Sequence, residues 1–119
     1  MKSISLILVA LFAIKGNNIF AQSEKTDTIK VYGNCGMCKS RIEKTVKAEG
    51  VSYAFWDQKL KNLIVTYDPA KISNEAIQKS IAAVGHDTDK FSADDKVYNK
   101  LPGCCHYDRK EKKKTDQDQ

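Results

Sequence analysis

The sequence predicts an α+β fold in which two helices pack on one face of an antiparallel sheet. Stretches with alternating apolar and polar residues indicate strands, and stretches with apolar residues three or four apart indicate helices. The expected order is β-α-β-β-α-β, which places both helices on the same side of the sheet. The expected strands cover residues 28–32, 51–56, 63–67 and 86–91, and the expected helices cover 38–48 and 74–84.

The first strand and the first helix flank a turn that carries two thiols. Ile29 and Val31 alternate with polar residues, whereas residues 23–27 are polar and are expected to fray. Beyond the turn, Ile42 and Val46 lie four residues apart, as on one face of a helix.

The middle of the chain predicts a hairpin followed by the second helix. The polar residues 57–59 join two strands, and Asp68-Pro69 forces the next turn. Ser73 is a suitable N-cap for the helix that follows, and Gly85 is a suitable residue to end it.

The second strand carries large apolar side chains on both of its faces. Tyr53 and Phe55 point to one face and Trp56 to the other, although a half-exposed sheet usually has one polar face. We therefore expect a short third helix over residues 93–101, capped by Ser92, to lie across the otherwise open face.

The N-terminal residues have the pattern of a secretory signal peptide. A positive start precedes the apolar run 4–14, and Ala21 offers a small residue at the exit. The run is shorter than the ~20 residues that span a bilayer, although a retained anchor is the alternative. We expect cleavage after Ala21 and a periplasmic or secreted protein without a membrane anchor.

The exported part divides into a domain at 22–91, an extension at 92–108 and a charged tail at 109–119 that we expect to be disordered. Loss of Lys2 and Lys15 lowers the formal net charge from +5 to +3. The lysines are scattered, so no nucleic-acid partner is indicated. Motifs for hydrolysis or nucleotide use are missing, which favours a protein that is not an enzyme.

Cys35 and Cys38 make the first turn a candidate metal site. The start of a helix has free N–H groups that favour a thiolate. Two neighbouring thiolates can share a soft metal ion or oxidise to a disulfide. The alternatives are a thiol–disulfide oxidoreductase that uses the same pair, a module held by disulfides, and two ordinary core cysteines.

Residues 28–91 resemble the heavy-metal-associated domain family, which includes copper metallochaperones, metal-binding modules of P-type ATPases and the periplasmic mercury-binding protein. The matching features are Cys35-x-x-Cys38, Ile42-Glu43, Gly50-Val51, Tyr67-Asp68-Pro69 and Val84-Gly85. The resemblance implies a ferredoxin-like β-α-β-β-α-β sandwich, here with a short C-terminal helical extension. It also implies that Cys35 and Cys38 bind one soft ion.

By this resemblance the protein is an exported metallochaperone or metal buffer. We expect Cu(I) as the ion, and Hg(II), Zn(II) and Cd(II) also accept two thiolates. The expected partner is a metal transporter or a P-type ATPase, and the expected state is a monomer.

The thiol loop departs from the family's pattern. The family commonly has Gly-Met-x-Cys, but Gly33-Asn34-Cys35 is one residue shorter, and Met37 lies between the cysteines without an assumed ligand role. Asn34 stands where the residue type varies with metal preference. His86 replaces the usual Tyr or Phe near the loop. It is a candidate third ligand, a proton-dependent gate, a hydrogen-bond donor to a thiolate, or simply a filler of the aromatic's space.

Cys104, Cys105 and His106 form a second cluster outside the family's pattern. A strand of about six residues carries the chain roughly 20 Å away from the loop, and a helix of about nine residues returns it roughly 13 Å. These three residues are therefore candidate further ligands, with disulfides or free thiols as alternatives. Export places all four cysteines where disulfides can persist, so their redox state stays open.

Overall fold

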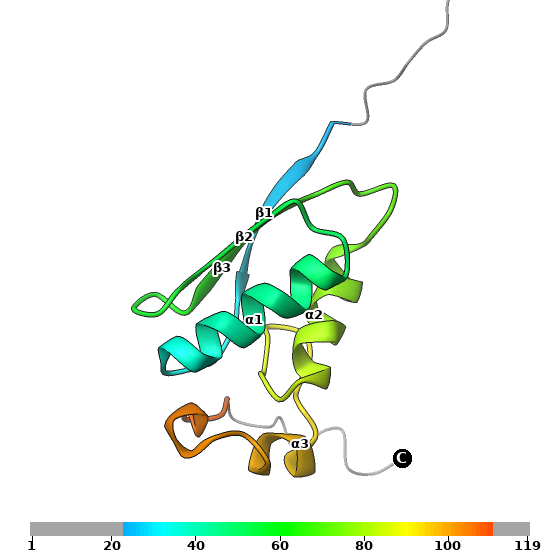
Figure 1. Ribbon diagram of the computed structural model, residues 1–119. Helices are drawn as coiled ribbons and strands as arrows, with labels where there is room; N and C mark the ends of the chain where they lie inside the picture. The colour runs from blue at the N-terminus through cyan, green and yellow to red at the C-terminus, as the bar shows by residue number, and fades with distance from the viewer. Residues whose placement is uncertain (1–22, 111–119) are drawn as a thin grey trace, which may run out of the picture.

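Two helices cover one face of a three-stranded antiparallel sheet (Figure 1). The computed structural model describes residues 23–110, so the predicted signal peptide and residues 111–119 lie outside the described residues. The elements are β1 (Lys25–Lys30), α1 (Gly36–Ala48), β2 (Tyr53–Asp57), β3 (Asn62–Tyr67), α2 (Asn74–Ala83), α3 (Asp95–Asn99) and the 3₁₀ turn η1 (Gly103–Cys105). The α+β prediction is confirmed. Between residues 23 and 110, no helix has the length and apolar character to cross a membrane.

The strand β1 begins earlier than predicted. The sheet order is β1-β3-β2, and Lys25 already pairs with Tyr67. The Asp27 carboxylate accepts hydrogen bonds from the Tyr67 hydroxyl and the Asn74 amide. The prediction that residues 23–27 fray is therefore wrong from Lys25 onward, because side-chain partners hold this polar stretch in the sheet.

The predicted fourth strand at 86–91 is wrong in length. It is reduced to a single bridge between Val31 and Thr88. The Thr88 N–H donates to the Phe91 carbonyl at 2.8 Å, and the Thr88 hydroxyl donates to Gln78 Oε1 at 2.8 Å. These bonds turn the chain back after one residue pair, because the Phe91 carbonyl and a side chain of α2 bind the polar groups of Thr88 in place of further strand pairing.

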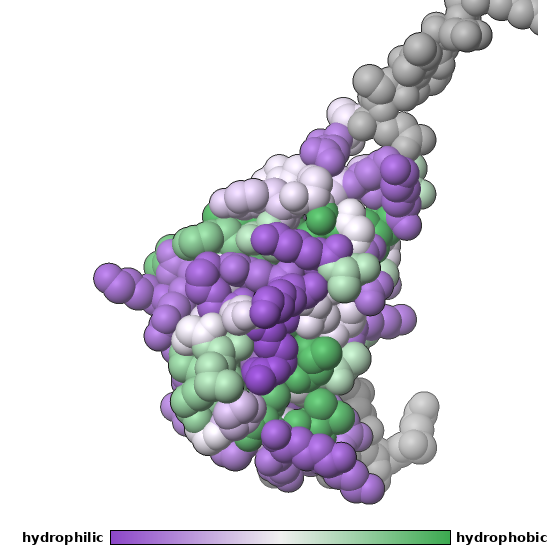
Figure 2. Space-filling view, in the orientation of Figure 1, coloured by the Kyte–Doolittle hydropathy of each residue, from purple (hydrophilic) through white to green (hydrophobic). Residues whose placement is uncertain are grey.

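The core lies between the two helices and the sheet face that they cover. Trp56 is completely buried there, and its indole N–H donates to the Val31 carbonyl at 3.0 Å. The aliphatic core residues are Ile29, Val31, Ile42, Val46, Val51, Ala54, Leu63, Val65, Ile77, Ile81 and Leu101. Figure 2 shows hydrophilic residues over the exposed side of α1, and hydrophobic residues toward the end of the molecule where α1 begins.

The third helix is shorter than predicted and lies elsewhere. The Asp94 side chain caps α3, in place of Ser92. Figure 1 shows α3 and η1 at the end of the molecule where α1 begins, away from the uncovered sheet face. Tyr53 and Phe55 on that face stay 52% and 41% exposed, so the predicted cover is wrong. The tail packs at the end of the core because Leu101 and Tyr107 are buried there.

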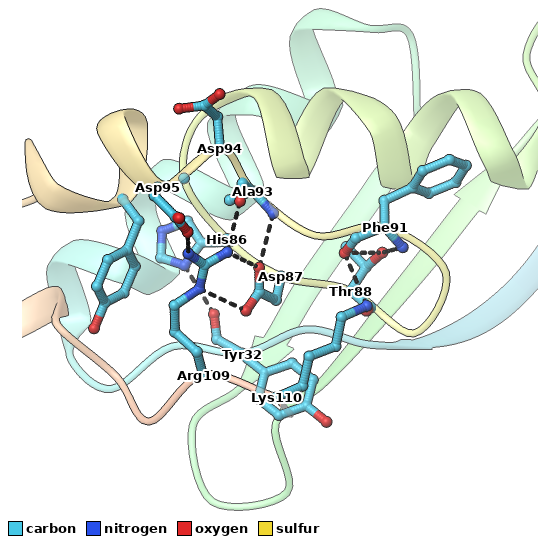
Figure 3. Close-up of polar contacts among 12 residues, drawn as sticks. Tyr32, His86, Asp87, Thr88, Phe91, Ala93, Asp94, Asp95, Arg109 and Lys110 are labelled. Atoms are coloured by element: carbon cyan, nitrogen blue, oxygen red, sulfur yellow. Dashed lines mark hydrogen bonds and ion pairs between the residues drawn. The ribbon is translucent and has the colours of Figure 1, made fainter. Parts of the chain in front are cut away.

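The start of the predicted disordered tail is also ordered. Arg109 donates to the Asp87 carboxylate at 2.7 and 3.0 Å, and to the Ala93 carbonyl at 2.6 Å (Figure 3). Lys110 donates to the carbonyls of Thr88 and Phe91. Placing Arg109 and Lys110 in a disordered segment was wrong, because buried acceptors bind these cations.

Candidate metal centre

The two loop thiols lie at the start of α1, as predicted. Cys35 is the N-cap residue, and Cys38 is buried in the first turn. Their Sγ atoms are 3.5 Å apart. The backbone N–H of Asn34 points to Cys38 Sγ at 3.5 Å, so the loop backbone itself faces a sulfur. This places both sulfurs within reach of one ion.

The loop rests on the buried indole of Trp56. A Cβ added to Gly33 would lie 3.0 Å from Trp56 Cζ2 and 3.1 Å from the Cβ of Cys38. Glycine therefore lets the chain pass between the indole and the helix. The sequence did not show this contact, because Trp56 comes from a strand far along the chain.

Both tail cysteines meet the loop, although the chain does not reach it by the predicted elements: the strand is a single bridge and α3 has five residues. Cys105 is buried, and its Sγ is 3.2 Å from Cys35 Sγ. The Sγ atoms of Cys35, Cys38 and Cys105 all lie within 4.8 Å of one another. Cys104 is exposed, with its Sγ 2.9 Å from Cys35 Sγ and 3.5 Å from Met37 Sδ. All four cysteines are free thiols.

Arg41 is a residue of the site that sequence reasoning missed. Its Nη1 donates to Cys105 Sγ at 3.4 Å. The available signal was its spacing, because a residue three positions after Cys38 lies on the same side of α1. A fixed positive charge thus stands beside the sulfur cluster.

The two histidines lie outside the three-sulfur group. His86 lies beside the end of the first strand, as predicted, with Nδ1 2.8 Å from the Tyr32 carbonyl oxygen, and it is buried. Its Nε2 is buried without a hydrogen-bond partner in residues 23–110, and its ring stacks on Tyr107. Burial lowers the pKa of His86. His106 is exposed, and its ring lies against Tyr98.

The sulfur cluster concentrates negative charge on one atom. Burial acts to raise the pKa of Cys35, but hydrogen bonds from the Cys104 thiol, the Cys38 backbone and the Cys105 thiol lower that pKa to about 6. Burial raises the pKa of Cys38 to about 12 and also raises the pKa of Cys105. The metal-free cluster therefore holds one thiolate, on Cys35, at neutral pH.

We expect iodoacetamide to modify Cys35 first in the reduced protein. The thiolate is the nucleophile, and a pKa of about 6 instead of 9.0 means that the thiolate predominates at neutral pH and is lost as the pH falls through 6. Peptide mass spectrometry should show a Cys35 rate that levels off by about pH 7. Cys104 is the internal control, since its hydrogen bond to Cys35 raises its pKa. If the modification rates of Cys35 and Cys104 rose together with pH above 7, the expectation would be contradicted.

Several solved structures are similar to this chain. Oxidized MerP from Ralstonia metallidurans CH34 is 30% identical, with 56% of this chain and 96% of that chain covered and a TM-score of 0.52. A putative copper-ion-binding protein from Bacillus anthracis str. Ames is 27% identical, with 58% and 100% covered and a TM-score of 0.54. The water-soluble region of the P-type ATPase CopA from Bacillus subtilis is 33% identical, with 56% and 46% covered and a TM-score of 0.53. No family model and no curated protein sequence matches the chain.

Proposed function

Because this chain belongs to the heavy-metal-associated domain family, we propose that it binds one Cu(I) ion as cargo through Cys35 and Cys38. The observation that carries the proposal is the pair of sulfurs 3.5 Å apart at the start of α1. Thiolates are soft ligands that suit Cu(I). The chain is a metal-binding domain and not an enzyme. Its structural neighbours include a metallochaperone and a putative copper-ion-binding protein.

Capture begins at Cys35, because its lowered pKa makes it a thiolate before the ion arrives. Cu(I) bonds to this sulfur, and the Cys38 thiol then loses its proton to solvent as the second bond forms. Delivery runs in reverse through ligand exchange. A thiolate of the partner bonds to the ion before Cys35 or Cys38 releases it, so no bare ion forms.

The protein works outside the cytoplasm and passes its ion to a metal transporter or a P-type ATPase, or stores it. Export is supported by the pattern of residues 1–21, which lie outside the described residues. The likeness to the soluble region of a P-type ATPase supports a transporter as partner. We propose a monomer, since exchange needs the thiol loop to be accessible.

The test is an anaerobic titration of the reduced protein with Cu(I), in competition with a chromogenic chelator and with native mass spectrometry for stoichiometry. We expect one ion per chain and an affinity at least about 100-fold lower in Cys35→Ser/Cys38→Ser, a difference of roughly 2.7 kcal/mol. Ser40→Ala, an exposed change on the same helix, is the matched control. Titrations with Hg(II), Zn(II) and Cd(II) rank the ions. A reduced wild type that takes no Cu(I) from the chelator would contradict the proposal.

A further inference from the structure

The C-terminal extension supplies a third sulfur to the loop site. Cys105 is buried against Cys35, and its position is set by contacts on both sides of η1. We propose that Cys105 is the third ligand of the cargo ion, so that Cys35, Cys38 and Cys105 form a closed three-sulfur site. This inference rests on the proposed function and assigns the coordination of that same site.

The distances between the sulfurs fit a trigonal site better than a linear one. With metal–sulfur bonds of about 2.3 Å, three sulfurs around one ion lie about 4 Å apart, whereas two opposed sulfurs lie about 4.6 Å apart. Cys35 Sγ is 3.5 Å from Cys38 Sγ and 3.2 Å from Cys105 Sγ. A small outward movement of each sulfur makes room for an ion in a trigonal site. A linear site between Cys35 and Cys38 would need a larger movement of the two sulfurs and would leave Cys105 without a bond to the ion.

Leu101 fixes the extension ahead of Cys105. Gly85 has a φ of +108°, and a Cβ added there would lie 3.0 Å from the Leu101 side chain. Leu101 is itself buried, so it packs directly on the backbone after α2. The 3₁₀ turn then begins two residues later, and the Cys105 N–H donates to the Pro102 carbonyl at 2.8 Å.

Tyr107 fixes the extension after Cys105. Its hydroxyl donates to the Gly85 carbonyl at 2.7 Å and accepts from the Asp87 N–H at 2.9 Å. The Tyr98 hydroxyl donates to the Tyr107 carbonyl at 2.7 Å. Arg109 adds its ion pair with the buried Asp87, and the close-up view shows it joining the segments around Asp87 and Ala93 (Figure 3). Cys105 is thus held on a fixed frame, as a preorganised ligand needs.

Arg41 matches the charge that a third thiolate would bring. Three thiolates around Cu(I) carry a net charge of −2, which is costly beside a buried core. The Arg41 guanidinium, 3.4 Å from Cys105 Sγ, offsets part of that charge. Cys104 differs from Cys105 in burial: it is exposed, and its sulfur, 2.9 Å from Cys35 Sγ and 4.0 Å from Cys105 Sγ, contacts the exposed Met37. It is the outer sulfur at the rim of the site.

X-ray absorption at the copper edge tests the inference on the full reduced chain loaded with one Cu(I). We expect three sulfur neighbours in the wild type and in Cys104→Ser, but two in Cys105→Ser, with a Cu(I) affinity about 10-fold lower. If Cys105→Ser fails to fold, the wild-type and Cys104→Ser spectra still test the inference, because neither contains that substitution.

Two sulfurs in a wild type that binds Cu(I) would overturn the third ligand and leave the proposed function standing. A change from three sulfurs to two in Cys104→Ser would assign the third ligand to Cys104 and also overturn the inference. A wild type that binds no Cu(I) would overturn both.

Discussion

Trp56→Ala should lower the free energy of unfolding by about 3–5 kcal/mol. Trp56 is completely buried, so its removal leaves a large cavity under the sheet. The change also deletes the hydrogen bond to the Val31 carbonyl and the ring that packs against Gly33. We therefore expect the thiol loop to loosen along with the core. Urea denaturation followed by circular dichroism measures the loss of stability.

Tyr53→Ala is the matched control for Trp56→Ala. Tyr53 lies on the same strand but is 52% exposed on the uncovered face. Its removal should cost less than about 1 kcal/mol, because surface substitutions away from packed features have small effects. Equal losses in the two variants would contradict the assignment of Trp56 to the centre of the core.

Asp87→Ala should destabilise the protein by about 3 kcal/mol, because it removes the buried partner of Arg109 and leaves the guanidinium with the exposed Asp95 as its remaining carboxylate partner. The Asp87 carboxylate is almost completely buried and accepts two bonds from Arg109 and one from the Ala93 N–H. Its hydrogen bonds raise the pKa of Arg109, so the guanidinium stays charged. The C-terminal extension should detach, which exposes Cys105. Urea denaturation and the rate of Cys105 modification by a thiol reagent measure the two effects.

Asp89→Ala is the control for this prediction. Asp89 is exposed and lies two residues from Asp87, so its loss tests the effect of removing a negative charge from the same segment. Stability and Cys105 reactivity should stay close to those of the wild type. If Asp87→Ala left Cys105 as protected as Asp89→Ala does, the ion pair would not be what holds the extension in place.

The elements with a strong local pattern were predicted well. Ile42 and Val46 face the core from α1, and Ser73 caps α2 through its side chain, both as expected. The pair Cys35 and Cys38 also lies where predicted, at the start of a helix. These features depend on residues within a few positions of one another, which periodicity and capping preferences describe.

The errors lie where distant residues compete with a local pattern. The fourth strand stops at Thr88 because its hydroxyl bonds to Gln78 on α2. The third helix lies away from the open sheet face because the Leu101 side chain packs against the backbone of Gly85. Arg109 is ordered because it forms an ion pair with the buried Asp87. In each case the partner is far away in the sequence, and only the folded chain shows that it is within reach.

The α+β order and the position of the two thiols before the first helix follow from the spacing of neighbouring residues, so they can be predicted from the amino-acid order alone. The other groups that reach those thiols are known only from the folded chain. It brings Cys105 and Arg41 to them, and it leaves His86 stacked on Tyr107 and His106 at the surface. A ligand set depends on side chains that meet across space, and packing and buried ion pairs bring them together rather than spacing along the chain.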